Sequence, residues 1–132
     1  PLCSCGNRGC FENYITKNAI KKKYDLSSYK QLIDEAFDNE QEAIGIVDEI
    51  AKCFSSGIVN AINLFDLDAV IIFGELNYRH ELLFEKIQLE INNRSIITKA
   101  HPVKVLPSII TTESKNAFST TNVIDRYFMQ ML

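Results

Sequence analysis

Three cysteines near the start of the chain carry its clearest chemistry: Cys3, Cys5 and Cys10 lie within eight residues. Thiolates are soft ligands that bind zinc, and three at this spacing can point at one centre if the backbone turns tightly. Gly6 and Gly9 permit that turn, because glycine adopts backbone conformations that other residues avoid. The segment therefore predicts a zinc site, one ligand short of the usual tetrahedral four.

Two other structures would contain the same three cysteines: a reduced surface loop without a metal, and a strained local disulfide. The fourth cysteine, Cys53, stands alone, and His80 and His101 lie far along the chain. A disulfide scaffold would spread its cysteines through the chain, so a reducing cytosol with a clustered metal site fits better. Arg8 and the start of a helix near Phe11 are expected to lower the thiol pKa values.

Two further segments could bind ligands. Glu12 falls in the first turn of an expected helix, where the helix dipole favours a carboxylate by about 0.3–1 kcal/mol, with or without a ligand. Gly74-Glu75 follows a strongly apolar strand and precedes a helix. A phosphate could bind there, because the carboxyl end of a strand opens onto a crevice and helix amides attract anions.

The composition is that of one soluble domain, or one lobe of a larger one. The chain has 132 residues, 46% hydrophobic and 23% charged, with a formal net charge of −3. That charge gives no general attraction to nucleic acid or to an anionic membrane. No apolar run approaches the roughly 20 residues that cross a bilayer, and no secretion signal is visible, which favours a cytoplasmic protein. The start at Pro1, close to the cysteine motif, suggests an excised segment.

The apolar periodicity outlines the elements that must position these residues. It predicts helices over about 11–24, 28–37, 41–64, 78–92 and 116–132, and strands over 69–73 and 103–110. Ser28 with Gln31 has the spacing of a capping box at a helix start. Gly57 inside the long helix costs up to about 1 kcal/mol relative to alanine, which predicts the close approach of another element.

The two predicted strands indicate an α/β fold that this chain does not complete. The continuous apolar character of 69–73 suits a strand covered on both faces of a parallel sheet. Pro107 places the second strand at an edge or a bulge. Two strands cannot form a whole α/β sheet, so we expect the chain to complete a sheet begun upstream or to pair with another copy.

The motif Cys-x-Cys-Gly-x-x-Gly-Cys-x-Glu, from Cys3 to Glu12, resembles the zinc motif of the ROK family of repressors and sugar kinases. The stretch from Asn60 to Asp66 and the strand from Ile71 to Gly74 extend the resemblance, which weakens after about Ala100. It implies the C-terminal part of an actin-like ATPase (ribonuclease H-like) sugar kinase fold. Residues 1–132 would form the C-terminal lobe of a sugar-binding domain, with 1–12 as the zinc loop and 13–132 as helices plus a strand–helix–strand unit.

The resemblance also implies roles for particular residues. A histidine upstream of Pro1 would supply the fourth ligand of a structural zinc, and Glu12 would accept hydrogen bonds from sugar hydroxyls. The family's kinases carry paired glycines near the nucleotide, where this chain has Gly74-Glu75, and a Gly-Ala pair where it has Asn116-Ala117. Unless Glu75 faces solvent or a metal bridges the two groups, its carboxylate would repel a phosphate about 4 Å away by around 4 kcal/mol. Both departures make ATP binding less favourable.

The resemblance therefore implies a sugar-responsive transcriptional repressor, of which this chain is part of the effector-binding and dimerisation region. Its partners would be a monosaccharide or a derivative, a second copy of the protein, and DNA through an upstream winged helix-turn-helix. The alternative is a ROK sugar kinase that phosphorylates a hexose with ATP; its catalytic aspartate would lie upstream, so no catalytic residue is expected here. A third hypothesis is a zinc-stabilised sugar-binding module without a DNA-binding element.

Overall fold

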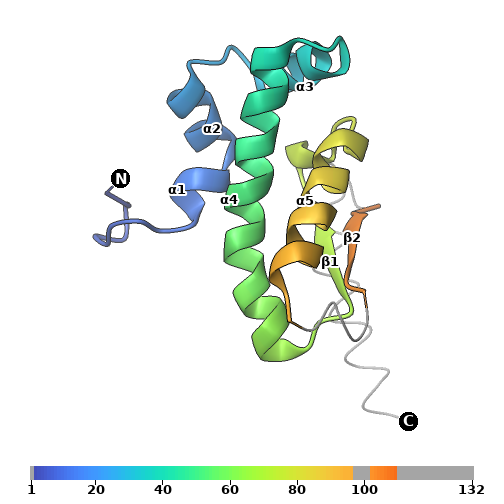
Figure 1. Ribbon diagram of the computed structural model, residues 1–132. Coiled ribbons are helices and arrows are strands. Elements are labelled where there is room, and N and C mark those ends of the chain that lie inside the picture. Colours follow the sequence, from blue (N-terminus) through green and yellow to red (C-terminus); the bar gives the residue numbers. More distant parts are fainter. Residues whose placement is uncertain (1, 97–101, 110–132) are drawn as a thin grey trace.

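The computed structural model describes residues 2–96 and 102–109 (Figure 1). Its elements are α1 (Glu12–Ile15), α2 (Lys17–Tyr24), α3 (Tyr29–Phe37), α4 (Gln41–Phe65), β1 (Ala69–Ile72), the 3₁₀ helix η1 (Glu75–Asn77), α5 (Glu81–Arg94) and β2 (Lys104–Pro107). The predicted α/β character is confirmed. The helix predicted over 116–132, with Asn116-Ala117, lies outside the described residues, as does His101.

Helix α4 is the central element of the structure. In Figure 1, α1 lies on one side of α4, whereas α5 and the two strands lie on the other. The helix has 25 residues, and its apolar side chains recur at helical spacing, so that one broad stripe is buried. The buried members of the stripe include Val47, Ile50, Ala51, Phe54 and Ile62. No helix within the described residues combines the length and the apolarity needed to cross a membrane.

The two strands pair in parallel, with Ala69 opposite Lys104 and Ile72 opposite Pro107. The side chain of Gln88 in α5 makes two hydrogen bonds to the backbone of the β2 segment. Its amide nitrogen donates to the Val103 carbonyl at 2.6 Å, and its amide oxygen accepts from the Val105 N–H at 2.9 Å. The Gln88 amide thus satisfies one carbonyl and one N–H of the β2 segment, as the backbone of a neighbouring strand would. The predicted strand–helix–strand order is confirmed.

The prediction that the first strand is covered on both faces does not hold within the described residues. Ile72 turns towards the helices and is buried, whereas Ile71 is 66% exposed and Phe73 and Leu106 are also exposed. Because successive side chains of a strand point to opposite faces, the described helices cover one face of this small sheet. The apolar character of both faces agrees with a sheet that other segments complete.

Two local predictions are corrected in the N-terminal helices. The helix expected over 11–24 is broken at Thr16, whose backbone is extended (ψ 148°) and whose side chain accepts from the Ala19 N–H at 3.3 Å. A hydroxyl that caps a new helix competes with continuation of the old one. At the next helix Ser28 caps the Gln31 N–H as predicted, but the Gln31 side chain donates to Glu35.

The packing of α5 on α4 predicts very different effects for two leucines of α5. Leu83 is fully buried and Leu89 is 56% exposed. Leu83→Ala should lower the free energy of unfolding by about 2–5 kcal/mol, because it leaves a cavity between the helices. The matched control, Leu89→Ala, should change it by no more than about 0.5 kcal/mol. Urea denaturation measures both, and equal losses would contradict the packing described here.

Candidate functional site

The loop before α1 is folded by its own backbone and by its two glycines. The Cys3 N–H donates to the Asn7 carbonyl at 2.8 Å, and the Gly6 N–H donates to the Cys3 carbonyl at 3.0 Å. Gly6 and Gly9 have φ values of 86° and 75°, which side chains rarely adopt. The tight turn predicted from these glycines is confirmed.

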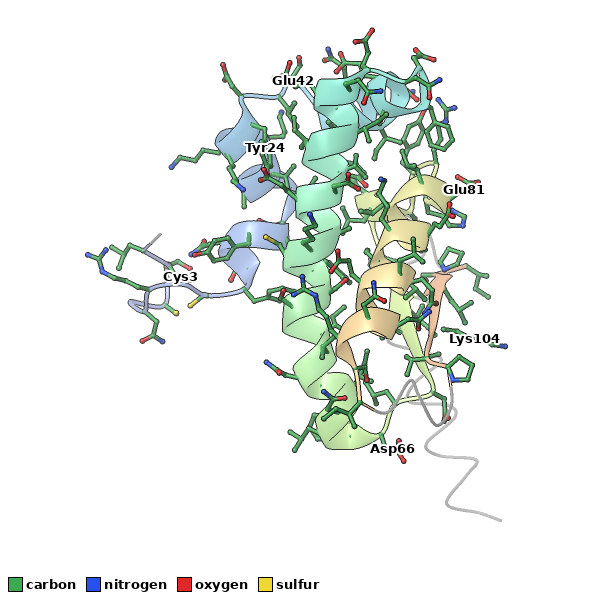
Figure 2. All side chains as sticks on the ribbon, in the orientation of Figure 1. Cys3, Tyr24, Glu42, Asp66, Glu81 and Lys104 are labelled. Carbon is green, nitrogen blue, oxygen red and sulfur yellow. The ribbon has the colours of Figure 1, made fainter. Side chains whose placement is uncertain are left out.

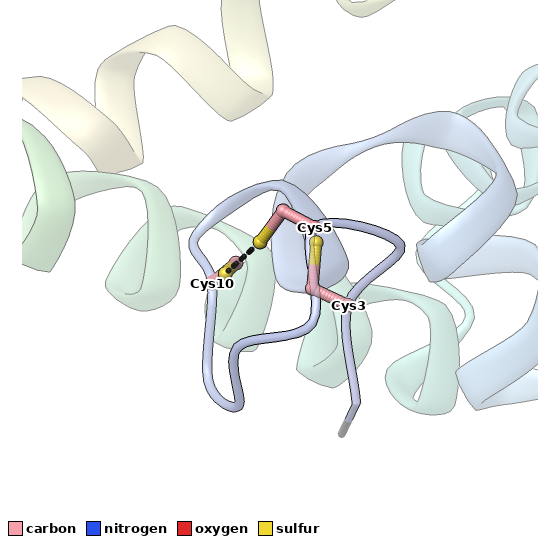
Figure 3. Close-up of side chains that lie close together, drawn as sticks. All are labelled: Cys3, Cys5 and Cys10. Carbon is pink, nitrogen blue, oxygen red and sulfur yellow. Dashed lines mark hydrogen bonds between the residues drawn. The ribbon is translucent and has the colours of Figure 1, made fainter.

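This turn brings the three predicted ligands together. The sulfurs of Cys3, Cys5 and Cys10 all lie within 4.8 Å of one another, and those of Cys5 and Cys10 are 3.5 Å apart (Figure 3). Cys3 is buried, Cys5 is exposed and Cys10 lies between. Three soft donors around one point, with one side open, fit a tetrahedral zinc that takes its fourth ligand from elsewhere. His80 is not in this cluster, since its ring packs against Phe84.

The crowded thiols perturb one another. Hydrogen bonds from the Cys5 backbone and thiol lower the pKa of Cys3. Hydrogen bonds to the thiols of Cys5 and then Cys3 raise the pKa of Cys10 to about 11. Arg8 is not among these causes, so the prediction that it lowers the thiol pKa values is wrong for Cys10. Neighbouring thiolates repel each other, and without a cation between them one retains its proton.

Glu12 lies two residues after Cys10, the last cysteine of this cluster. It is in the first turn of α1, as predicted, its side chain is exposed, and Phe11 occupies the N-cap position. The Asn13 N–H donates to the Cys10 carbonyl at 3.0 Å, so the last cysteine and the helix start form one turn. Because α1 has four residues, its dipole is weaker than that of the longer helix predicted. The dipole therefore favours the Glu12 carboxylate less than predicted.

Gly74 and Glu75 lie apart from the cysteines. They follow β1, on the other side of α4 from the cysteine loop (Figure 1). Gly74 has a φ of 94°, and Glu75 begins the short helix η1. The helix predicted from Tyr78 instead begins at Glu81, and the three-residue helix η1 lies between it and Gly74. A hollow of about 290 Å³ is lined here by Tyr29, Lys30, Gly74, Glu75 and Tyr78.

One polar network beside this hollow was not predicted. Asp34 of α3 accepts hydrogen bonds from Arg79 at 2.8 Å and from the Tyr78 hydroxyl at 3.0 Å. Arg79 also lies 3.9 Å above the Phe37 ring and has a positive φ of 40°. The hydrogen bond from Arg79 is the main reason that the pKa of Asp34 is lowered. The network ties α3 to the segment after Gly74 across 45 residues of chain, which no local pattern could indicate.

Known sequences similar to this chain include repressors and sugar kinases. Residues 1–121 match the model of the ROK family. The xylose repressor of Bacillus spizizenii is 26% identical over the whole chain, which covers 35% of that protein. The glucokinase of Thermotoga maritima is 29% identical over 64% of the chain, covering 32% of that enzyme. The chain thus spans about a third of the length of these relatives.

Solved structures give the same result for the fold. A ROK family transcriptional regulator, a homologue of the Escherichia coli MLC protein, superposes with a TM-score of 0.71 at 21% identity, over 81% of this chain and 31% of that one. A ROK glucokinase from Streptomyces griseus, in complex with glucose and AMPPNP, has a TM-score of 0.73 at 21% identity, over 86% and 44%. At this identity the likeness shows the fold, which is the actin-like fold of ROK proteins.

The sulfur cluster predicts which cysteine is needed for a metal. Cys5→Ser should reduce zinc affinity by more than the roughly 10–100-fold that loss of an outer-shell partner costs, because a coordinating thiolate is removed. Cys53→Ser is the matched control, since Cys53 lies outside the cluster and should retain zinc. Zinc content after purification under reducing conditions measures both variants. Equal zinc content in the two proteins would contradict the site.

Proposed function

The chain belongs to the ROK family, and from this premise we propose that it is part of the effector-binding and dimerisation region of a sugar-responsive transcriptional repressor. The observation that carries the proposal is the turn in which three converging cysteines lead directly into Glu12. The xylose repressor of Bacillus spizizenii supports it, since the similarity extends over the whole chain. The whole protein would be cytoplasmic and would act as an oligomer.

The metal in this proposal is structural. Cys3, Cys5 and Cys10 would hold a zinc ion, and a histidine upstream of Pro1 would complete the tetrahedron. The ion would neutralise the crowded thiolates and fix the loop. Its effect on the sugar is indirect, since it holds the turn that presents Glu12.

Glu12 is the proposed sugar contact. An ionised carboxylate accepts hydrogen bonds through both oxygens, so it can bind two adjacent hydroxyls of a sugar ring. Glu12 is exposed, and the Cys10–Asn13 hydrogen bond holds its backbone. The remaining contacts to a monosaccharide would come from upstream residues.

Sugar binding would control DNA binding through the arrangement of a dimer. A ligand shifts an equilibrium only if it binds one state more tightly than the other. We propose that the sugar bound at Glu12 favours one of two dimer arrangements, and that an upstream helix-turn-helix contacts DNA in the other.

A sugar kinase is the second candidate, favoured by the similarity to the Thermotoga maritima glucokinase. The Gly74-Glu75 segment favours the repressor, because Glu75 stands where the kinases that this chain resembles carry a second glycine. Its side chain is exposed and lines the hollow together with Lys30, so its charge opposes a phosphate there less than a carboxylate turned into the hollow would. Nucleotide binding at Gly74 and Glu75 would thus be degenerate, and no residue of this chain is assigned a catalytic role.

The proposal predicts that sugar affinity depends on the charge of Glu12. In the full gene product, Glu12→Gln should weaken binding of D-xylose or D-glucose about 10–100-fold, the effect of losing one charged hydrogen bond. Glu42→Gln is the matched control, because Glu42 is also an exposed carboxylate in the first turn of a helix. Isothermal titration calorimetry measures both affinities.

Three results would count against this account. If the wild-type protein bound neither sugar, sugar sensing would be wrong. If Glu12→Gln bound like the control, the assignment of Glu12 would be wrong. If the wild-type protein bound Mg-ATP tightly and phosphorylated the sugar, the kinase would replace the repressor.

A further inference from the structure

Gly57 makes the close contact that its position in the long helix predicted. It lies within α4 and faces the ring of Phe11. A Cβ atom at position 57 would lie 2.3, 2.5 and 2.6 Å from three carbons of that ring. Carbon atoms in contact are normally about 3.5–4.0 Å apart, so the ring occupies the space where any other side chain would begin.

Phe11 connects this glycine to the candidate site. It stands between Cys10, the last thiol of the cluster, and Glu12, and it is the N-cap residue of α1. Its ring also packs against Phe54, one helical turn before Gly57, with ring centroids 6.1 Å apart. On α4, Gly57 and Phe54 thus contact the ring of the residue that lies between the cysteine cluster and the Glu12 carboxylate.

The cysteine loop has few other attachments to the body of the structure. Within residues 2–96 and 102–109, the backbone hydrogen bonds of the loop join it to itself and to Asn13 of α1. Its position relative to α4 therefore depends on the packing of α1 and of the Phe11 ring against that helix.

We propose that Gly57 is a positioning residue of the candidate site: by admitting the Phe11 ring against α4, it sets where Cys10 and Glu12 lie. The part of this inference that concerns sugar binding rests on the proposed function. A methyl group at position 57 would displace the ring, which is 37% exposed, from its contact with α4. Without that contact the backbone of Phe11, and with it Cys10 and Glu12, would no longer be held against the helix. Sites of this kind tolerate displacements of about 0.5 Å before binding weakens.

The test compares two glycines of one helix in the zinc-loaded full gene product. Gly57→Ala should weaken binding of D-xylose or D-glucose about tenfold or more, as the misplacement of one charged hydrogen bond implies. Gly45→Ala is the matched control, because a Cβ at Gly45 meets no atom within 4 Å. Both changes raise helix propensity, so both proteins should fold, and the control should bind sugar like the wild type.

A double mutant separates positioning through Phe11 from a general effect on the helix. Phe11→Ala should itself weaken sugar binding, and adding Gly57→Ala to it should have no further effect, because no ring remains to be displaced. Losses that simply multiply would overturn the proposal. So would a Gly57→Ala protein that binds sugar like the Gly45→Ala control, and that result would leave the proposed function standing.

If the wild-type protein binds neither sugar, the proposed function fails, and zinc release then decides the positioning claim. The rate of zinc transfer to a chelator reports on Cys10 without any sugar. Faster transfer from Gly57→Ala than from Gly45→Ala would support the proposal, and equal rates would overturn it.

Discussion

The convergence of three cysteine sulfurs is the constraint on which the candidate site depends. Three thiolates within 4.8 Å repel one another without a cation between them, and hydrogen bonds to the thiols of Cys5 and then Cys3 raise the pKa of Cys10. The left-handed conformations of Gly6 and Gly9 allow the turn that produces this crowding. A metal ion bound by the three thiolates would remove the repulsion between them, and the loop would then hold the start of α1 in place.

The other helices and the strands are arranged around helix α4. The cysteine turn and α1 lie on one of its sides, and α5 with the two strands lies on the other (Figure 1). As Figure 2 shows, Cys3 and Lys104 lie at opposite sides of the molecule, with α4 between them. Glu12, the proposed sugar contact, and Gly74 therefore lie on elements at different sides of this helix.

Local patterns in the sequence were sufficient for much of this structure. The cysteine spacing, the apolar stripe of α4 and the parallel strand–helix–strand order each depend on residues close together in the chain. The contact at Gly57 was also predictable as a close approach, although its partner was not. The break at Thr16 was missed, because the apolar spacing on either side continues through it. Two features could not be predicted because they depend on tertiary packing: the insertion of η1 before α5 and the pairing of Asp34 with Arg79. The shifts in the thiol pKa values could not be predicted either, because they depend on the distances between the sulfurs.

X-ray absorption at the zinc K-edge of the full gene product would identify the atoms around the metal. We expect one zinc per chain, with three sulfur neighbours at about 2.3 Å and one nitrogen at about 2.0–2.1 Å. A zinc surrounded by oxygen and nitrogen without sulfur, or a protein prepared under reducing conditions that holds no zinc, would contradict it.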